Sequence, residues 1–177
     1  ERGLPERLSR IPASEVGREH LLEVHQEHYV NTAREIAERG GGNLDADTYV
    51  NDQSYDVAVL AAGGLLNLVD AIVDGQSDNG FALVRPPGHH ALPGRGMGFC
   101  IFNNIAVAAK YLLEEKGLER ILIVDFDLHH GNGTQETFYR DGSVFFLSMH
   151  RYPFYPGTGS PAERGEGAGL TRTLNLP

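Results

Sequence analysis

The sequence has one cysteine, Cys100, among 177 residues. An intrachain disulfide is therefore excluded, and the composition indicates a reducing, cytoplasmic compartment. Basic residues are also scarce: 15 Lys and Arg stand against 24 Asp and Glu, which gives a formal charge of −9. This balance argues against non-specific nucleic-acid binding and suits a cationic substrate. We see no signal peptide and no apolar run of about 18 residues, so no membrane span is predicted.

Helical and strand-like patterns of apolar residues alternate along the chain. Three segments are predicted to be helices: 14–38, 55–73 and 102–116. Four segments are predicted to be buried strands: 81–84, 120–127, 144–149 and 170–176. Residues 44–51 are predicted to form a loop. The alternation predicts a single α/β domain, a mainly parallel sheet with helices on both faces. Ligands of such sheets bind beyond the carboxyl ends of the strands.

The most informative segment is Ile121–Gly133, where an apolar strand runs directly into carboxylates and imidazoles. Asp125, Asp127 and His129 alternate with apolar residues, and a period of two places all three on one side of an extended chain. Carboxylate oxygen and imidazole nitrogen are typical ligands of divalent metals. A solvated polar loop is the alternative, and it accounts poorly for such a dense cluster after an apolar run. Asp127 and His129 are the predicted ligands, and a third ligand must come from elsewhere.

A second pair of histidines, His89 and His90, follows the stiff segment Arg85–Gly88. Two adjacent imidazoles on a fixed turn are suited to act as general base and as its acid or electrostatic partner. A surface His–His pair is the alternative. Asp125 is predicted to orient one imidazole or to bind a monovalent cation. Asn132 is predicted to orient the other imidazole as a neutral partner.

Two loops rich in glycine and aromatic residues follow predicted elements. The loop Gly94–Cys100 has no preceding strand and lacks the order of a phosphate-binding loop, so we reject nucleotide binding. Phe99 in this loop and Tyr155 in a later one are predicted to form opposite walls of a slot, with core packing as the alternative. Cys100 is not predicted to be a nucleophile, because nothing beside it marks a Cys–His site.

Taken together, four motifs resemble the zinc-dependent histone deacetylase family, which includes acetylpolyamine amidohydrolases and acetoin-utilization proteins. They are Arg85–His90, Gly98–Asn104, Asp125–Gln135 and Ser148–Gly159. The form of the third motif resembles class II enzymes and their bacterial relatives, and the likeness runs through nearly the whole chain. It implies the arginase-like deacetylase fold. It also implies hydrolysis of N-acetyl amides in acetyl-lysine peptides or proteins, or in acetylpolyamines.

The resemblance also implies a role for individual residues. Zn²⁺ would be bound by Asp127 and His129. The attacking water and the leaving amine would be served by His89 and His90, with Asp125 and Asn132 beside them. The substrate would be held by Asp47 (or, as a second choice, Asp45), Gly98, Phe99 and Tyr155, the last in place of a commoner phenylalanine. Potassium would be bound at an inner site by Asp125, Asp127, His129, Ser148 and Met149, and at an outer site that includes Phe138, Asp141 and Val144. Arg7 matches an arginine at the floor of the site.

The chain departs from the family pattern at its end. In the family, the third zinc ligand and the residue that stabilises the oxyanion lie beyond the position of Pro177. We therefore expect residues 1–177 to be the N-terminal portion of one deacetylase domain, which alone binds zinc poorly, catalyses little and has an exposed sheet edge. One alternative is a non-catalytic binding module that lacks the third ligand. Another is a two-manganese hydrolase of the arginase type, for which one two-ligand cluster offers too few carboxylates.

Overall fold

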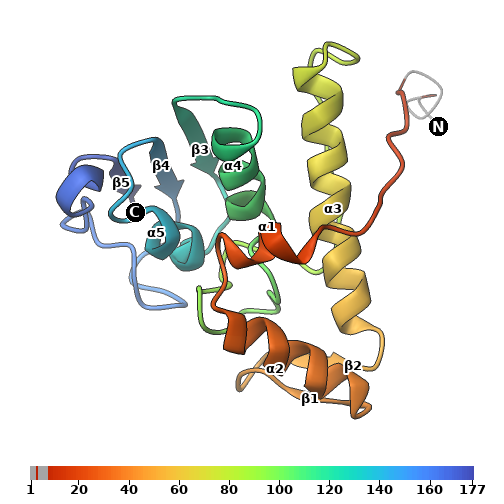
Figure 1. The fold of residues 1–177 in the computed structure, drawn as a ribbon. Coiled ribbons are helices and arrows are strands. Elements are labelled where there is room, and N and C mark those ends of the chain that lie inside the picture. Colours follow the sequence, from red (N-terminus) through yellow and green to blue (C-terminus); the bar gives the residue numbers. More distant parts are fainter. Residues whose placement is uncertain (1–2, 4–7) are drawn as a thin grey trace.

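The computed structural model describes residue 3 and residues 8–177. The helices are α1 (Arg18–Leu22), α2 (Glu27–Glu38), α3 (Ser54–Val73), α4 (Asn104–Glu114) and α5 (Asn132–Phe138). The strands are β1 (Gly41–Asn43), β2 (Tyr49–Asn51), β3 (Ile121–Asp125), β4 (Val144–Met149) and β5 (Thr173–Leu176). β3, β4 and β5 form a parallel sheet in that order, and β1 pairs with β2 in an antiparallel hairpin (Figure 1). The predicted parallel α/β sheet is therefore confirmed.

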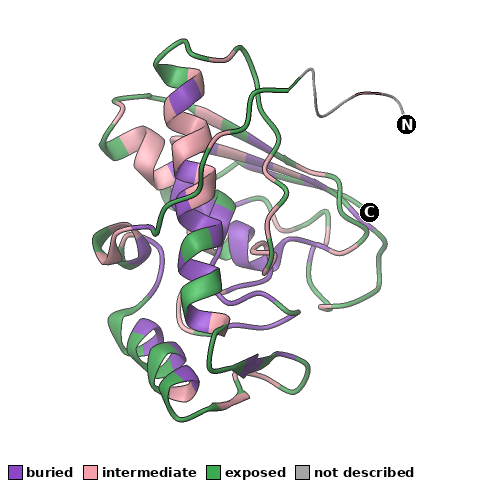
Figure 2. Cartoon of the chain, turned by 90° about the vertical axis from the view of Figure 1, so that its right-hand side faces the viewer, coloured by how far each residue is buried: buried purple, intermediate pink, exposed green. Residues whose placement is uncertain are grey.

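The core lies where α3, α4 and the N-terminal segment meet. α3 packs on α4, and the absence of a side chain at Gly63 lets the backbone of Ser14 pass directly over α3. Phe102 is buried at the centre, edge-on to the rings of Tyr29 and Tyr55. Buried residues gather on the inner sides of these helices (Figure 2). The tight α3 packing explains why a helix interior tolerates glycine, which alone costs about 1 kcal/mol relative to alanine.

α3 is long and apolar enough to cross a membrane by length and composition, with a mean hydropathy of 1.8 over 18 residues. The sequence analysis predicted no segment that could span a membrane, and this prediction is not borne out by the length and composition of α3. Core helices also pass this test, because it counts apolar residues and not their contacts. In α3, Ala58, Ala62 and Leu66 belong to the core cluster that α4 shares.

The single helix predicted over residues 14–38 is wrong, because the chain breaks between α1 and α2. At the break His25 turns into the core, where it is 2% exposed. Gln26 leaves the helical region, with φ −65° and ψ 138°, and its N–H donates to the carbonyl of Pro93 at 2.8 Å. Tertiary contacts with the loop at residues 92–103 therefore override the helical periodicity.

Two other local predictions need correction. Residues 81–84 form no strand, and Phe81 and Leu83 are 81% and 89% exposed. A strand needs a neighbour for its N–H and C=O groups, and the part of the chain that the structure describes supplies none here. Residues 44–51 are not wholly a loop, because 49–51 form β2. The hairpin leaves Asp47 and Thr48 in the turn between its strands.

One face of the parallel sheet is covered by helix, with α5 packed on β4 and with Phe146 and Ser148 buried. The opposite face carries accessible apolar side chains: Leu122, Val124, Leu174 and Leu176. The second helical layer that we expected is not among the described residues. A groove of about 600 Å³ runs between β3 and residues 82–88. Parallel sheets are normally covered on both faces, so an accessible apolar face of this kind is unusual.

Candidate active site

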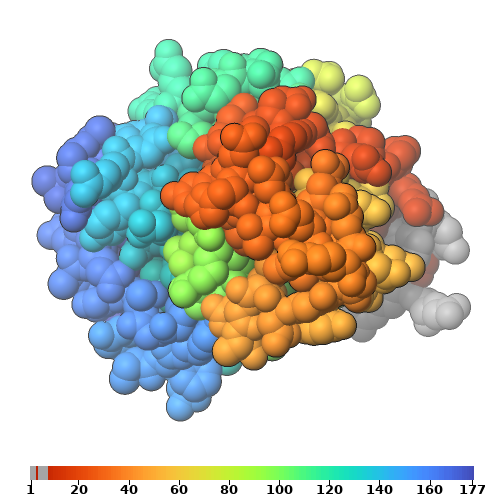
Figure 3. All heavy atoms as spheres, turned by 60° about the horizontal axis from the view of Figure 1, so that its bottom comes forward, coloured from red at the N-terminus to blue at the C-terminus, as the bar shows by residue number. Residues whose placement is uncertain are grey.

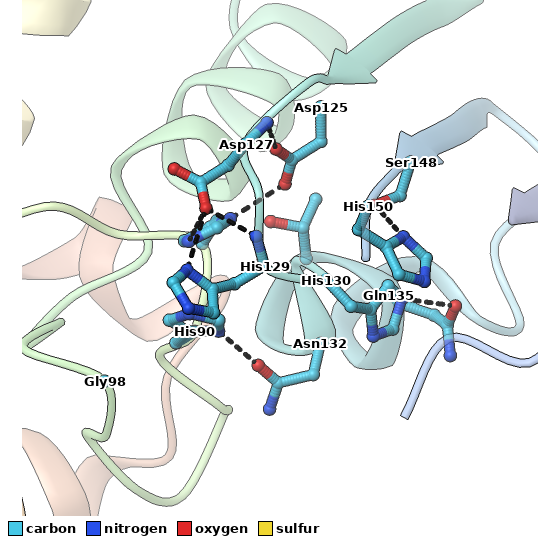
Figure 4. A network of polar contacts seen from close by, with 12 residues as sticks. His90, Gly98, Asp125, Asp127, His129, His130, Asn132, Gln135, Ser148 and His150 are labelled. Carbon is cyan, nitrogen blue, oxygen red and sulfur yellow. Dashed lines mark hydrogen bonds and ion pairs between the residues drawn. The ribbon is translucent and has the colours of Figure 1, made fainter. Parts of the chain in front are cut away.

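The polar segment after β3 is a series of turns. Asp125 Oδ1 accepts the N–H of Asp127 at 3.1 Å, and Asp127 Oδ1 accepts the N–H of His129 at 2.7 Å. Strand β3 ends at Asp125, so the predicted alternation of three side chains on an extended chain is wrong. The turns still bring His129 Nδ1 to 3.2 Å from Asp127 Oδ1. Asp125 points instead toward a different imidazole (Figure 4).

Asp127 and His129 fit one metal ion. Two ligands bound at about 2.0–2.1 Å to a tetrahedral ion lie about 3.3 Å apart, close to the observed 3.2 Å. Burial alone would raise the pKa of Asp127. The N–H of His129 and the charge of His89 outweigh burial and hold that pKa below its ordinary value. The carboxylate is therefore ionised at neutral pH, as metal binding requires.

The tandem histidines lie beside this pair, and each is held at Nδ1. His89 Nδ1 is 2.9 Å from Asp125 Oδ2, and His90 Nδ1 is 2.8 Å from Asn132 Oδ1. The sequence analysis predicted one imidazole beside Asp125 and the other beside Asn132 without assigning them, and the structure pairs His89 with the charged oxygen and His90 with the neutral one. Because both oxygens accept, each imidazole carries a proton at Nδ1.

His90 is packed closely on several sides. Its ring centroid is 4.0 Å from that of His89 and 5.2 Å from that of Tyr155. Gly98 has φ +58°, and a Cβ there would collide with the His90 ring. Burial lowers the pKa of His90 to about 4, and the neighbouring charge of His89 acts in the same direction. His90 is therefore neutral at pH 7.

The rim of the site is built around Asp47. Its Oδ1 accepts the N–H of Gly98 at 3.1 Å and the hydroxyl of Thr48 at 2.9 Å. Burial would raise the pKa of Asp47, but these hydrogen bonds and one from Tyr155 hold it below its ordinary value. Asp45 instead lies 3.8 Å from Arg95. Of the two candidates, Asp47 is the one bonded to the site loops.

The predicted wall residues Phe99 and Tyr155 are placed differently. Phe99 has φ +65°, which is rare outside glycine, and its ring is largely exposed. Its N–H donates to Thr48 Oγ1 at 3.1 Å. Tyr155 packs edge-on against His90 and His129, and Phe154 stacks on His129 with the rings 15° from parallel. The slot between Phe99 and Tyr155 stays a prediction.

Replacing Thr48 with valine, which has the same shape but no hydroxyl, is expected to lower the free energy of unfolding by about 1–3 kcal/mol. Thr48 is buried, and the change removes the acceptor of the Phe99 N–H and a donor to Asp47. Urea unfolding measures the loss. Thr32→Val is the control, since Thr32 is exposed on α2 and bonds only its own helix. Equal stability of the two variants would contradict the role of Thr48.

The residues predicted to bind potassium behave differently at the two sites. At the inner site, Asp125 and Ser148 are partners in the β3–β4 register, and Ser148 Oγ is 2.9 Å from His150 Nδ1. At the outer site, the Asp141 carboxylate pairs with Lys110 at 2.8 Å, while Phe138 and Val144 are buried. The lysine already neutralises that carboxylate, so the side chain of Asp141 does not fit a cation ligand. The inner oxygens fit one, and the inner site stays a prediction.

A buried polar network behind the site was missed by the sequence analysis. His130 Nε2 is 3.0 Å from Gln135 Oε1 (Figure 4). His130 Nδ1 is 2.8 Å from Thr158 Oγ1. Gln135 Nε2 donates to Glu163 Oε2 at 2.6 Å, and Glu163 also accepts the N–H of Gly159. The network ties the loop that carries Tyr155 to α5. No spacing in the sequence signals the network, because its contacts His130–Thr158 and Gln135–Glu163 each join residues 28 positions apart.

Other candidate groups do not join the site. Cys100 is buried, and burial raises the pKa of its thiol to about 12, which agrees with the prediction that it is not a nucleophile. Arg7 lies outside the described residues. Among residue 3 and residues 8–177, one trio has its ligand atoms within 4.8 Å of one another, namely His20, Glu23 and Glu115. It lies between α1 and the end of α4, so the Asp127–His129 pair has no third ligand among the described residues.

Comparison with known proteins agrees with this geometry. The model of the histone deacetylase domain matches residues 1–177. A probable deacetylase of Archaeoglobus fulgidus is 46% identical over 97% of this chain and 47% of its own length. A histone deacetylase-like amidohydrolase of Pseudomonas aeruginosa is 42% identical over 99% of this chain and 46% of its own. The chain thus spans about half the length of these relatives.

A solved structure gives the same result for the fold. The crystal structure of the HDA15 HD domain superposes with a TM-score of 0.95 at 43% sequence identity, covering 99% of this chain and 50% of that one. The parallel sheet is therefore part of the arginase/deacetylase fold that we expected. Because the family model matches residues 1–177, the chain belongs to the histone deacetylase family.

Proposed function

We propose that this chain carries the zinc-binding and water-activating residues of a deacetylase that hydrolyses N-acetyl amides of acetyl-lysine or acetylpolyamine type. One observation carries the proposal: two imidazoles, each held at Nδ1 by a different oxygen, lie beside a carboxylate–imidazole pair at metal spacing. Asp127 and His129 would hold the zinc. When bound, zinc polarises the acetyl carbonyl and lowers the pKa of water.

The tandem histidines then move the protons. Asp125 and Asn132 hold the two rings at Nδ1, so that the Nε2 of a neutral ring turns its lone pair toward the reacting groups. One Nε2 accepts the proton of the attacking water as its oxygen bonds to the carbonyl carbon. When the C–N bond breaks, an imidazole Nε2 returns a proton to the amine nitrogen. The products are acetate and the free amine.

The rim residues are suited to hold a cationic substrate in place. The ionised Asp47 carboxylate lies at the rim and can accept an N–H of the substrate, while Phe99 and Tyr155 offer apolar surface for its alkyl chain. The formal charge of −9 favours approach of a lysine-rich or polyamine substrate. A potassium ion at Asp125 and Ser148 would reinforce the end of the sheet below the zinc ligands.

We also propose that residues 1–177 are the N-terminal portion of a single deacetylase domain. The accessible apolar face of the sheet and the groove beside β3 support this, because each suits further packed structure. The groove reaches His89, Asp125 and Asp127. A segment packed there would therefore lie close enough to supply the third zinc ligand.

Replacing His89 or His90 with phenylalanine in the complete domain is expected to leave zinc content unchanged and to lower turnover by about 100-fold or more. Phenylalanine keeps the ring packing and removes the proton acceptor. Acetate release is measured from an acetyl-lysine peptide and from an acetylated polyamine, with His28→Phe on the exposed side of α2 as control. Full turnover in both variants would contradict the proposal. Stoichiometric zinc without any turnover in the unchanged domain would favour a binding module.

A further inference from the structure

His25 is a buried histidine that contacts two loops of the site and has no part in the chemistry above. It lies between α1 and α2 and is 2% exposed. Its Nδ1 is 3.1 Å from the carbonyl oxygen of Leu92, and its Nε2 accepts the N–H of Asn103 at 2.9 Å. The N-terminal helices lie against the loop near residues 90–100 (orange and green in Figure 3). The His25 ring thus connects the α1–α2 junction with Leu92 and Asn103, which lie 67 and 78 residues further along the chain.

The partners of His25 define its protonation. A backbone N–H can only donate, so Nε2 must offer a lone pair to Asn103. A carbonyl oxygen can only accept, so Nδ1 must carry the hydrogen that faces Leu92. The ring is therefore neutral, and burial lowers its pKa to about 4. A second proton would set an N–H of His25 against the N–H of Asn103.

The contact with Leu92 holds the end of the turn that carries the tandem histidines. Three carbonyls along this turn have separate donors. The carbonyl of His89 accepts the N–H of Gly133 at 2.9 Å, and that of Ala91 faces Asn103 Nδ2 at 3.4 Å. The third carbonyl, that of Leu92, lies two residues beyond His90 and faces His25 Nδ1 at 3.1 Å and the N–H of Arg95 at 3.4 Å.

The contact with Asn103 holds the other segment. Asn103 accepts the N–H of Ala106 at 3.1 Å and so caps α4, and its amide donates to Thr134 of α5 at 3.2 Å. Tyr29, one turn along from His25, donates its hydroxyl to the carbonyl of Ile101 at 2.6 Å. The α1–α2 junction therefore fixes the chain between Phe99 and α4 as well as the turn of the tandem histidines.

We propose that His25 is a positioning residue for the tandem histidines. Its neutral ring holds the turn at Leu92 in register with the start of α4, and this register keeps His90 facing Asn132 on α5. The catalytic consequence rests on the deacetylase function proposed above. The effect of His25 on the two loops does not depend on that function.

Three substitutions separate the two contacts of His25. In His25→Asn, the side-chain amide lies near the position of Nδ1, so it retains a donor for Leu92 and loses the acceptor for Asn103. In His25→Gln, the amide reaches the position of Nε2 and can still accept from Asn103. His25→Leu removes both contacts, and His28→Leu, three residues further along on exposed surface, is the matched control.

Hydrogen exchange of the Asn103 amide is the first measurement, on complete domains shown to be folded by thermal unfolding. Exchange is expected to accelerate about tenfold or more in His25→Asn and His25→Leu. It is expected to stay near the value of the unchanged domain in His25→Gln and His28→Leu. Exchange at Asn103 that is the same in His25→Leu and His28→Leu would overturn the proposal.

Steady-state kinetics on the same variants are the second measurement. His25→Leu is expected to lower kcat by about 10-fold to 100-fold, since displacement of a reacting group by about 1 Å has effects of this size. KM is expected to change little, because Asp47 and Tyr155 do not contact His25, and His25→Gln is expected to recover part of kcat. A KM effect with unchanged kcat would overturn the proposal. If the unchanged domain shows no deacetylation while Asn103 exchange responds as expected, the proposed function fails and the positioning role stands.

Discussion

Asp127→Ala is expected to lower zinc affinity by more than about 100-fold and to abolish deacetylation in the complete domain. Loss of a residue that merely supports a metal ligand costs about 10–100-fold in affinity, so loss of a ligand costs more. The substitution also removes the acceptor of the His129 N–H, at 2.7 Å, and so releases the turn that orients the second ligand. Zinc per protein after dialysis against a chelator, and acetate release, are the two measurements.

Two further variants separate these effects. Asp127→Asn keeps an oxygen for the His129 N–H but removes the charge. This variant is therefore expected to preserve the turn, and its zinc affinity is nevertheless expected to be low. Asp45→Ala removes a rim carboxylate that pairs with Arg95, and zinc affinity should not change. Full activity of Asp127→Ala without bound metal would refute the assignment of Asp127 as a ligand.

The contacts of the tandem histidines were predictable only in part from topology. Asp125 ends β3, and Asn132 begins α5 in the next connection. Residues that follow strands of a parallel sheet meet at one edge, which places Asp125 there, whereas the histidine turn reaches this edge although residues 81–84 form no strand. β4 was predicted with the bounds that it has in the structure, because Val144–Met149 is a short apolar run with a clear end.

The geometry after β3 was not predictable from alternation alone. Alternation assumes an extended backbone, but aspartate side chains can accept backbone N–H groups two residues along and so favour turns. Asp125 and Asp127 both do this. Local hydrogen bonding therefore ends the strand two residues earlier than predicted. The 3.2 Å spacing of the ligand pair results from these turns and not from an extended chain.

Thr48 and His25 were missed for another reason. Their partners, Phe99 and Asn103, lie 51 and 78 residues away, so no window of sequence contains both ends of either contact. The strand predicted at residues 81–84 was wrong for a similar reason, because strand formation also depends on distant residues. The apolar pattern of residues 81–84 is that of a strand, but pairing depends on a neighbour that no described residue provides.

Acid is expected to destabilise the fold through His25. The unfolded side chain has a pKa of 6.5, and burial lowers the folded value to about 4. Between these values the unfolded chain binds more protons, so the stabilising contribution is complete above pH 6.5 and is lost as the pH falls toward 4. A difference of this size corresponds to about 3 kcal/mol. The titratable side chain beside the ring is Tyr29, whose pKa is raised by burial, so it stays neutral throughout.

Urea unfolding at pH 7.5 and at pH 4 measures this contribution. His25→Gln is less stable than the unchanged protein at pH 7.5, because it loses the bond to Leu92, but it carries no titrating ring. Its decrease in unfolding free energy between the two pH values is expected to be smaller by about 3 kcal/mol. His90 and His130 also have pKa values lowered by burial, and since both proteins contain them, their effect cancels in the difference. His28→Gln should retain the full decrease, because His28 is exposed. Identical pH dependence of His25→Gln and the unchanged protein would show that His25 is not held neutral by its two backbone partners.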